Sequence, residues 1–442
     1  MEKNLTNGSV LKNLISFSLP FLLSYFLQTL YGLADLFIIG QFCDTAATTA
    51  VSNGSQVMHM LTVMIVGLAM GATVLIGKGV GSQNRELKNR AIGNAITLFL
   101  ILSVIVTIIL SICAMPIVNM MSTPADSVRG MYNYLRICFI GIPFITMYNV
   151  IGSVFRGMGD SKSPMYFVLI ACICNIALDY IFIGYMGFGA AGAALGTTCS
   201  QALSVIISIA FIIKNKMIVG FTPVYFTLDK SVLAEILKVG IPVSMQDGFI
   251  QVSFILITVF ANMRGVTDAA AVGIVEKLIG ILFLVPSTML SSVSAICAQN
   301  IGAGRDDRAR ETLKDAFIIV VGIGLVFAAA FQLIAAPAVG LFSSDSAVIA
   351  AGSAYMTAYV WDCVIGGMHF VFSGYFCALG KSWISFVHNV ISAFFVRIPL
   401  AYYFSTSFDS LHPMGFAAPV GSALSAVICI IAFAILQRQR CK

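Results

Sequence analysis

Residues 147–159 read MYNVIGSVFRGMG, and residues 368–380 read MHFVFSGYFCALG, 221 positions further along the chain. The same offset aligns other apolar and small residues on both sides of this stretch without a gap. The matching pairs are Val51 and Val272, Gly81 and Gly302, Ala95 and Ala316, Pro116 and Pro337, Ser122 and Ser343, Met147 and Met368, Phe155 and Phe376, and Gly159 and Gly380. A duplicated apolar half is typical of membrane transporters, whose substrate path lies between the halves. The duplication therefore indicates transport.

The composition indicates a membrane protein. The 442 residues are 59% hydrophobic and only 10% charged, whereas soluble domains carry about 25% charged residues. The 11 cysteines lie mostly inside apolar runs and show neither zinc-ligand spacing nor a disulfide framework. Lipid is therefore expected to be the main solvent of this chain.

Twelve apolar stretches are long enough to cross a bilayer, for which about 20 residues are needed. They are residues 14–42, 52–77, 91–115, 131–155, 164–186, 190–213, 233–262, 270–299, 315–337, 349–379, 382–405 and 415–436. The predicted fold is an all-α polytopic membrane protein with two pseudo-symmetric lobes of six transmembrane helices. Because six is even, both lobes have the same topology and form a parallel repeat.

Three regions are expected along the chain. Residues 1–216 form the N-terminal lobe, residues 217–231 a cytoplasmic linker, and residues 232–442 the C-terminal lobe. Twenty of the 25 Lys and Arg residues lie at the termini or in loops that follow even-numbered spans. The positive-inside rule then places both termini in the cytoplasm. The net charge of +6 reflects this asymmetry and predicts no nucleic-acid partner.

Ionisable residues at bilayer depth are costly and are usually functional or paired. The candidates are Asp35, Asp179, Asp247, Glu276, Lys277, Asp362 and Arg397. Asp35 and Asp179 each lie about seven residues before the outer end of their span, which places both about 10 Å below the surface. Asn175 shares a helix face with Asp179, and Thr197 lies at a similar depth in the next span.

Four oxygen-bearing side chains at one depth are suited to binding a hard cation or sharing a proton. The alternative is that they only hydrogen-bond helices together, as Asn and Thr commonly do in membranes. Two aspartates in one lobe favour the ion site. No ATP-binding G-x-x-x-x-G-K-[ST] motif occurs, so nothing in the sequence indicates that ATP drives the process.

Several motifs, taken together and in order, resemble the multidrug and toxic compound extrusion (MATE) family. They are residues 33–40, LADLFIIG; residues 156–160, RGMGD; residues 175–179, NIALD; residues 193–197, AALGT, with Ser200 and Gln201; and residues 299–304, QNIGAG. The resemblance covers essentially the whole chain. It implies a V-shaped pair of six-helix lobes that exports organic compounds in exchange for Na⁺ or H⁺.

The resemblance also implies site residues. The cation or proton site carries over to Asp35, Asn149, Asn175, Asp179 and Thr197. Pro20 is expected to be the bending point of the first helix, and its counterpart after a one-residue slip is Pro242. Gln28 and Tyr31 are expected to face the substrate cavity of the N-terminal lobe.

The chain departs from another branch of the family, which has a glutamate in the seventh helix and an aspartate in the tenth. Those places are Ile250 and about Met368 here. Asp247 lies one turn from Ile250 on the same face and is the candidate substitute in the substrate cavity. The departure favours an ion site in the N-terminal lobe.

The predicted function is export of small organic, amphipathic or cationic compounds by cation-coupled antiport with alternating access. The chain is expected to be a monomer in the bacterial cytoplasmic membrane and no enzyme. No cofactor is expected, and no metal beyond Na⁺ at Asp35 and Asp179. A flippase for lipid-linked precursors is the nearest alternative, although Lys277 and Arg397 supply few cationic side chains for it. A membrane-embedded lipid enzyme is the second alternative, for which no acid, Ser or His cluster is visible near one interface.

Overall fold

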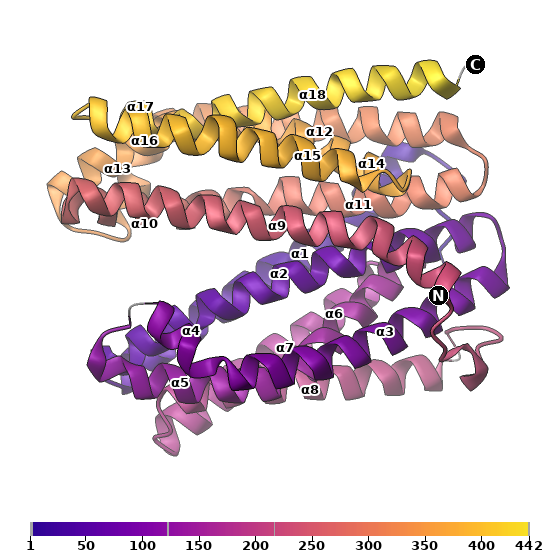
Figure 1. The fold of residues 1–442 in the computed structure, drawn as a ribbon, viewed down its shortest axis with the longest axis horizontal. Coiled ribbons are helices and arrows are strands. Elements are labelled where there is room, and N and C mark those ends of the chain that lie inside the picture. The colour runs from indigo at the N-terminus through magenta and orange to yellow at the C-terminus, as the bar shows by residue number, and fades with distance from the viewer. Residues whose placement is uncertain (1–2, 122, 216, 441–442) are drawn as a thin grey trace. The chain divides into compact units, whose positions relative to one another are not determined.

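The computed structural model describes residues 3–121, 123–215 and 217–440, and within these ranges the chain forms helices and no strand (Figure 1). The predicted all-α fold is confirmed. The predicted region boundaries at residues 1, 216 and 442 lie outside the described residues.

The helices of the first half are α1 (Val10–Phe42), α2 (Thr45–Gly81), α3 (Arg85–Ile112), α4 (Ala114–Met120), α5 (Ala125–Ile140), α6 (Ile142–Gly157), α7 (Lys162–Asp179), the π-helical segment η1 (Tyr180–Tyr185) and α8 (Ala190–Lys214). A 3₁₀ turn, η2 (Pro223–Tyr225), leads to α9 (Lys230–Arg264). The remaining elements are α10 (Val266–Leu282), α11 (Leu284–Gly302), α12 (Asp306–Gly340), α13 (Ser346–Tyr359), α14 (Asp362–Ala378), α15 (Ser382–Ser392), the π-helical segment η3 (Ala393–Arg397), α16 (Ile398–Ser407), α17 (His412–Gly415) and α18 (Ala417–Arg440).

Ten helices of the described ranges are long and apolar enough to cross a membrane, and two bent pairs raise the number to as many as twelve. The pair α5 and α6 bends by 52°, and the pair α13 and α14 bends by 42°. These pairs correspond to the spans predicted at 131–155 and 349–379. The twelve predicted spans are therefore confirmed, with two of them broken.

The chain packs as two compact units. The first unit comprises residues 1–5 and 16–240, and the second comprises residues 6–15 and 241–442. The first turns of α1 therefore belong to the second unit, and the first turns of α9 belong to the first unit. Pro20 and Pro242 lie inside α1 and α9, close to these changes of unit, and both helices continue through their proline.

Close approaches at glycines hold the first unit together. A Cβ atom at Gly71 of α2 would lie 2.0 Å from the carbonyl oxygen of Ile236 in α9. A Cβ atom at Gly240 of α9 would lie 2.2 Å from the carbonyl oxygen of Leu68 in α2. The first turns of α9 therefore pack backbone to backbone against α2, which explains why they belong to the first unit.

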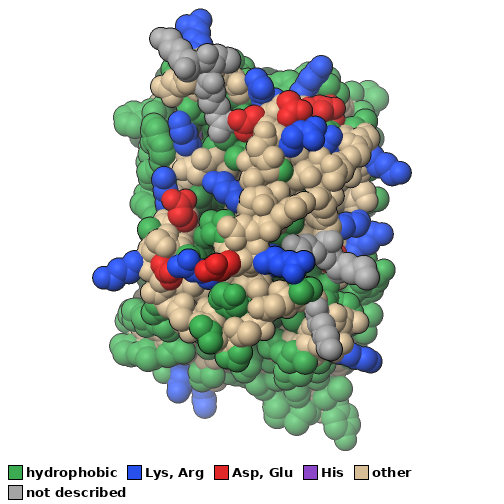
Figure 2. Space-filling model, turned by 90° about the vertical axis from the view of Figure 1, so that its right-hand side faces the viewer, with side chains coloured by type: hydrophobic (Ala, Val, Ile, Leu, Met, Phe, Trp, Pro, Cys, Tyr) green, Lys and Arg blue, Asp and Glu red, His purple; other side chains and the backbone are tan. Residues whose placement is uncertain are grey.

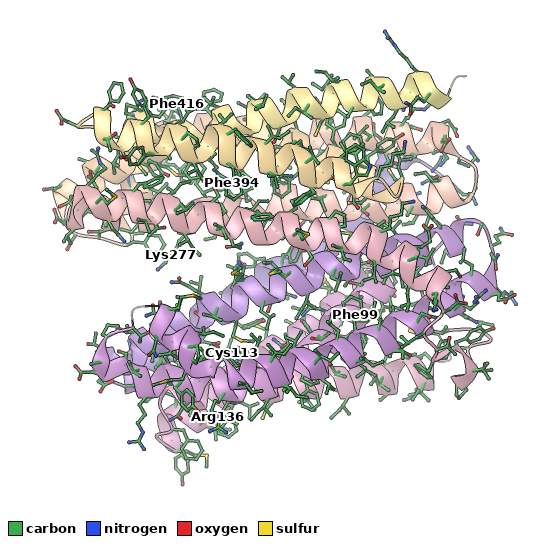
Figure 3. All side chains as sticks on the ribbon, in the orientation of Figure 1. Phe99, Cys113, Arg136, Lys277, Phe394 and Phe416 are labelled. Atoms are coloured by element: carbon green, nitrogen blue, oxygen red, sulfur yellow. The ribbon has the colours of Figure 1, made fainter. Side chains whose placement is uncertain are left out.

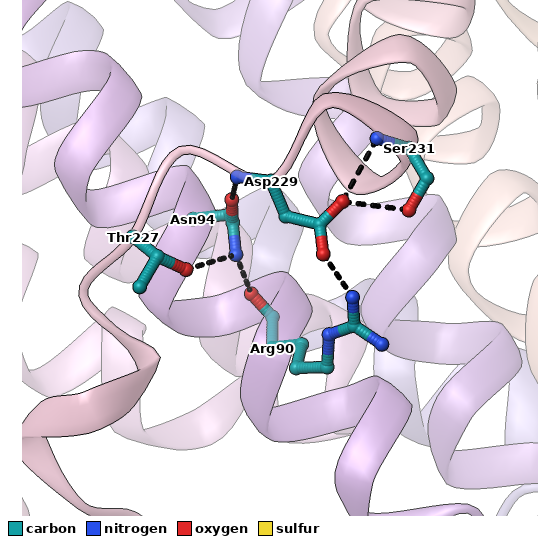
Figure 4. Close-up of polar contacts among 5 residues, drawn as sticks. All are labelled: Arg90, Asn94, Thr227, Asp229 and Ser231. Atoms are coloured by element: carbon teal, nitrogen blue, oxygen red, sulfur yellow. Dashed lines mark hydrogen bonds and ion pairs between the residues drawn. The ribbon is translucent and has the colours of Figure 1, made fainter.

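The segment that precedes α9 is fastened to α3 (Figure 4). The Asn94 amide donates to the Thr227 hydroxyl at 3.4 Å, and its oxygen accepts from the Asp229 backbone N–H at 2.6 Å. Arg90 forms an ion pair with Asp229, which also accepts from the Ser231 hydroxyl at 2.7 Å. Residues 227–231, at the end of the segment predicted as a linker, are therefore docked against α3.

The helix surfaces show which solvent surrounds them. Large apolar side chains are exposed along the transmembrane lengths, among them Ile112, Ile213 and Leu333 at 71–83% exposure. Such surfaces are unfavourable in water and are expected against lipid tails. Figure 2 looks at the right-hand end of Figure 1, where Lys and Arg gather among Asp and Glu and hydrophobic side chains border them.

Candidate functional site

Asp35 lies buried within the first unit, on the part of α1 beyond Pro20. Its Oδ2 accepts a hydrogen bond of 3.2 Å from the Thr197 hydroxyl of α8. Its Oδ1 is buried and has no hydrogen-bond partner among the described residues. The carboxyl group therefore keeps unused capacity for a proton or a cation.

Asp179 is the last residue of α7 and is fully buried. The Asn175 amide, one turn earlier, donates to Asp179 Oδ2 at 3.5 Å. Asp179 also interacts directly with Asp35, so the two carboxyl groups meet although they come from helices far apart in sequence. The α-helix changes to the π-helical segment η1 immediately after Asp179, and such irregular turns are frequent at functional sites.

Gly196 allows α8 to reach Asp179. A Cβ atom at this position would lie 2.0 Å from Asp179 Oδ1 and 3.6 Å from the Asn175 amide nitrogen. No side chain fits in this space, so the backbone of α8 forms one wall of the cluster. The sequence prediction missed Gly196 as a site residue, although it directly precedes Thr197 in the AALGT motif.

The cluster of Asp35, Asn175, Asp179 and Thr197 offers carboxyl, amide and hydroxyl oxygens. The Oδ1 atoms of Asp35, Asn175 and Asp179 are all buried without hydrogen-bond partners among the described residues. Hard cations prefer such oxygen ligands, and two adjacent carboxyl groups readily share a proton. In the described ranges no three His, Cys, Asp or Glu side chains come together as potential metal ligands.

The other site residues predicted for the first unit, Gln28, Tyr31 and Asn149, lie outside this four-residue cluster. Tyr31 accepts a hydrogen bond of 3.5 Å from Gln201 on α8. Asn149 donates to the carbonyl oxygen of Ile145 in its own helix at 2.8 Å. Gln28 and Asn149 both line a small cavity. Within the described residues no hydrogen bond joins Asn149 to the cluster.

The second unit has apolar residues where the first has its cluster. At the 221-residue offset, Asp35 corresponds to Leu256, Asn175 to Val396 and Asp179 to Leu400. Asp247 is partly buried and makes no hydrogen bond or ion pair with the described residues. The two units therefore share a scaffold but differ in their polar interior.

A separate set of charges lies in the second unit. Arg397, at the end of η3, lies 3.6 Å from Asp362 and donates to the Tyr359 hydroxyl at 2.8 Å. Glu276 accepts from the Thr258 hydroxyl at 3.3 Å, whereas its neighbour Lys277 is exposed on α10 (Figure 3).

Comparisons with known proteins agree with this architecture. A family model described as MatE matches residues 20–181 and 242–403, one match in each half of the chain. The chain is 26% identical over 404 residues to the probable multidrug resistance protein YoeA of Bacillus subtilis, which covers 90% of this chain and 87% of that protein. It is 28% identical over 400 residues to the probable multidrug resistance protein YpnP of the same organism, with 90% and 89% covered.

Solved structures share the fold. A MATE crystal structure in complex with MaL6 superimposes with a TM-score of 0.92 over 98% of this chain and 99% of that chain, at 21% identity. A multidrug resistance MATE family transporter of the MOP superfamily in an outward-facing conformation also gives a TM-score of 0.92, with 98% of each chain covered at 21% identity.

Proposed function

This chain belongs to the MatE family, and from that premise we propose that it exports small organic compounds across a membrane in exchange for Na⁺ or H⁺. The chain is an integral membrane protein, because its long apolar helices accompany its membership of this transporter family. The curated relatives are described as multidrug resistance proteins, which supports an amphipathic or cationic organic substrate and a role as a carrier, not an enzyme.

The observation that carries the coupling proposal is the buried pair Asp35 and Asp179. The Oδ1 atom of each aspartate and Oδ1 of the neighbouring Asn175 are buried without hydrogen-bond partners among the described residues. The second unit has Leu256 and Leu400 at the places that match the two aspartates. Burying carboxyl groups without a counter-charge is unfavourable, so a proton or a cation is expected to occupy the cluster for much of the cycle.

Alternating access follows if the ion and the organic compound prefer different conformations. An ion that binds one state more tightly shifts the population towards that state, and the coupling free energy acts equally on both ligands. Pro20 lies inside α1, the helix that carries Asp35, and is the proposed bending point of that helix. Binding of a proton or a cation at Asp35 is thus proposed to change the bend of α1 at Pro20.

We further propose that the protein works as a monomer in the bacterial cytoplasmic membrane. The excess of Lys and Arg in loops after even-numbered spans supports cytoplasmic termini under the positive-inside rule. No cofactor takes part in the proposed cycle.

The proposal is tested with the purified chain in sealed vesicles that contain a fluorescent organic cation. Imposed Na⁺ and pH gradients are applied separately, and dye movement is followed over time. Movement that depends on one gradient supports cation-coupled antiport and identifies the ion. Dye movement that ignores both gradients, or no movement at all, contradicts it.

A further inference from the structure

The first unit contains a small cavity that the proposed ion site does not use. Its volume is about 30 Å³, and residues of α1, α2, α6, α7 and α8 line it. One water needs about 10–15 Å³ by this measure, so the cavity holds one or two waters or a small ion. Asp35, Asp179, Asn175 and Thr197 are not among its lining residues.

Arg156, from the last turn of α6, is the charged residue of the cavity wall. Its Nη2 donates to the Ser153 hydroxyl at 2.6 Å, and its guanidinium group lies 4.9 Å from the centre of the Phe21 ring. Among the described residues no carboxylate forms an ion pair with Arg156. Arg156 is partly buried, and a ring face compensates the lost hydration of such a cation only in part.

A second observation points to a ligand. Tyr148 lies about two turns before Arg156 on α6. It also lines the cavity and is 9% exposed. Its hydroxyl group is buried beside the Gln28 side chain of α1, which lines the same cavity, and it forms no hydrogen bond of good distance and angle with the described residues. A buried polar group without a partner is unfavourable, so a group that accepts a hydrogen bond from Tyr148 would relieve it.

We propose that this cavity binds a monovalent anionic group, held between the Arg156 guanidinium group and the Tyr148 hydroxyl group. The group is a free halide such as chloride or the carboxylate of a transported compound, since both accept hydrogen bonds and balance one positive charge. The volume admits a chloride ion or a single carboxylate but no complete organic molecule. The inference goes beyond the proposed function, because it concerns a second ligand of opposite charge.

The test uses the full-length protein in detergent and needs no transport. Thermal unfolding is followed with a thiol-reactive dye while chloride replaces gluconate at constant Na⁺ and ionic strength. A ligand that binds only the folded chain raises the unfolding midpoint, and the concentration dependence gives its affinity. We expect a saturable rise with chloride in the parent protein.

Variants identify the site. Tyr148→Phe removes one donor and is expected to weaken chloride affinity about tenfold or more, as for a hydrogen bond to a charged group. Arg156→Gln is expected to abolish the saturable rise, and Arg156→Lys to retain a weaker one because a lysine keeps the charge but not the planar fork. If Arg156→Gln does not fold, Tyr148→Phe decides the question.

Matched controls lie elsewhere in the same unit. Arg136→Gln changes an exposed arginine of α5 (Figure 3) that lies 5.7 Å from the centre of the Tyr132 ring without lining the cavity. Tyr166→Phe changes an exposed tyrosine of α7. Both controls are expected to keep the parent's chloride response.

Competition experiments distinguish the two sources of the anionic group, a free halide and the carboxylate of a transported compound. A dye with a carboxylate and its methyl ester are added to chloride titrations. If the carboxylate raises the apparent chloride dissociation constant and the ester does not, the substrate's carboxylate occupies the site; if neither competes, the occupant is the free halide. A chloride response that is absent, or identical in Arg156→Gln, Tyr148→Phe and the parent, means that the cavity holds water only and overturns the inference.

Discussion

The hydroxyl group of Thr197 on α8 donates a hydrogen bond to Oδ2 of Asp35 on α1 at 3.2 Å, across a sequence separation of 162 residues. This contact fixes one carboxylate oxygen and leaves Oδ1 of Asp35 without a partner beside Asp179. The contact therefore links the proposed ion site to the packing of α1 against α8.

Thr197→Val removes this hydrogen bond while keeping the shape of the side chain. Hydrogen bonds between membrane helices contribute about 0.6–2 kcal/mol, which corresponds to roughly a threefold to thirtyfold change in affinity. We expect the half-saturating concentration of the coupling ion to rise by such a factor, measured as vesicle efflux against ion concentration. Thr197→Ser keeps the hydroxyl and should retain the parent value; a Thr197→Val protein with the parent's ion dependence would argue against a coordinating role.

Gly196→Ala is expected to distort the cluster, because the added methyl group would clash with Asp179. The added Cβ would lie 2.0 Å from Asp179 Oδ1, so the aspartate or α8 must move, at a typical cost of about 1–3 kcal/mol for an overpacked interior. We expect a lower unfolding midpoint and weakened efflux. Gly40→Ala is the control, because open space surrounds Gly40 on α1 and alanine favours the helix; equal effects of both changes would refute the steric explanation.

The linker contact predicts a pH dependence well below the working range. Hydrogen bonds from Ser231, followed by the neighbouring Arg90, lower the pKa of Asp229 to about 2. Because the folded-state pKa lies below the unfolded value of about 3.9, the ionised form stabilises the fold above that value. This contribution is lost as the pH falls towards 2. Asp229→Asn should therefore lower the unfolding midpoint equally from pH 5 to 8, and its efflux should keep the parent's pH profile. A pH profile that shifts with this change would place a titrating step in the linker.

The pair Asp362 and Arg397 should behave as a buried ion pair of the second unit. Their side chains are 3% and 13% exposed. Removing one partner of such a pair typically costs about 3–5 kcal/mol because the other charge stays buried and unpaired. Asp362→Asn should thus unfold at a clearly lower denaturant concentration, and Asp362→Asn with Arg397→Met should lose less than the sum of the two single changes. Additive losses would show that the two groups do not interact.

An exposed pair provides the reference for that experiment. Arg305 and Asp307 lie 3.5 Å apart with side chains 49% and 64% exposed. Solvent screens such pairs, so Asp307→Asn is expected to leave the unfolding midpoint unchanged.

The hydrophobic pattern was sufficient to predict the helices and their duplication, because the apolar runs of a membrane protein carry that information directly. Counting residues from the ends of their spans also predicts one depth for Asp35, Asp179, Asn175 and Thr197. In the structure, hydrogen bonds join Asn175 to Asp179 and Thr197 to Asp35. Sequence distance along a helix is a reliable guide to depth since the rise per residue is fixed.

Features that depend on contacts between helices were not predictable. α5 ends at Ile140, where a Cβ atom at Gly141 would lie 2.5 Å from the Thr198 side chain of α8, and the break is tied to that contact. Arg156 lies in the RGMGD motif, and its side chain turns to the Phe21 ring and a cavity, which the motif does not indicate. Spacing along one helix contains no information on either partner.

Asp35 and Asp179 are proposed to couple ion flow to export. The decisive measurement imposes the driving Na⁺ or pH gradient on vesicles that contain Asp35→Asn or Asp179→Asn protein. Asn keeps the size of the side chain but cannot take up a proton or balance a cation's charge. Gradient-driven dye efflux should be lost in both variants, while their unfolding midpoints remain close to the parent's. Normal gradient-driven efflux by both variants would contradict this proposal.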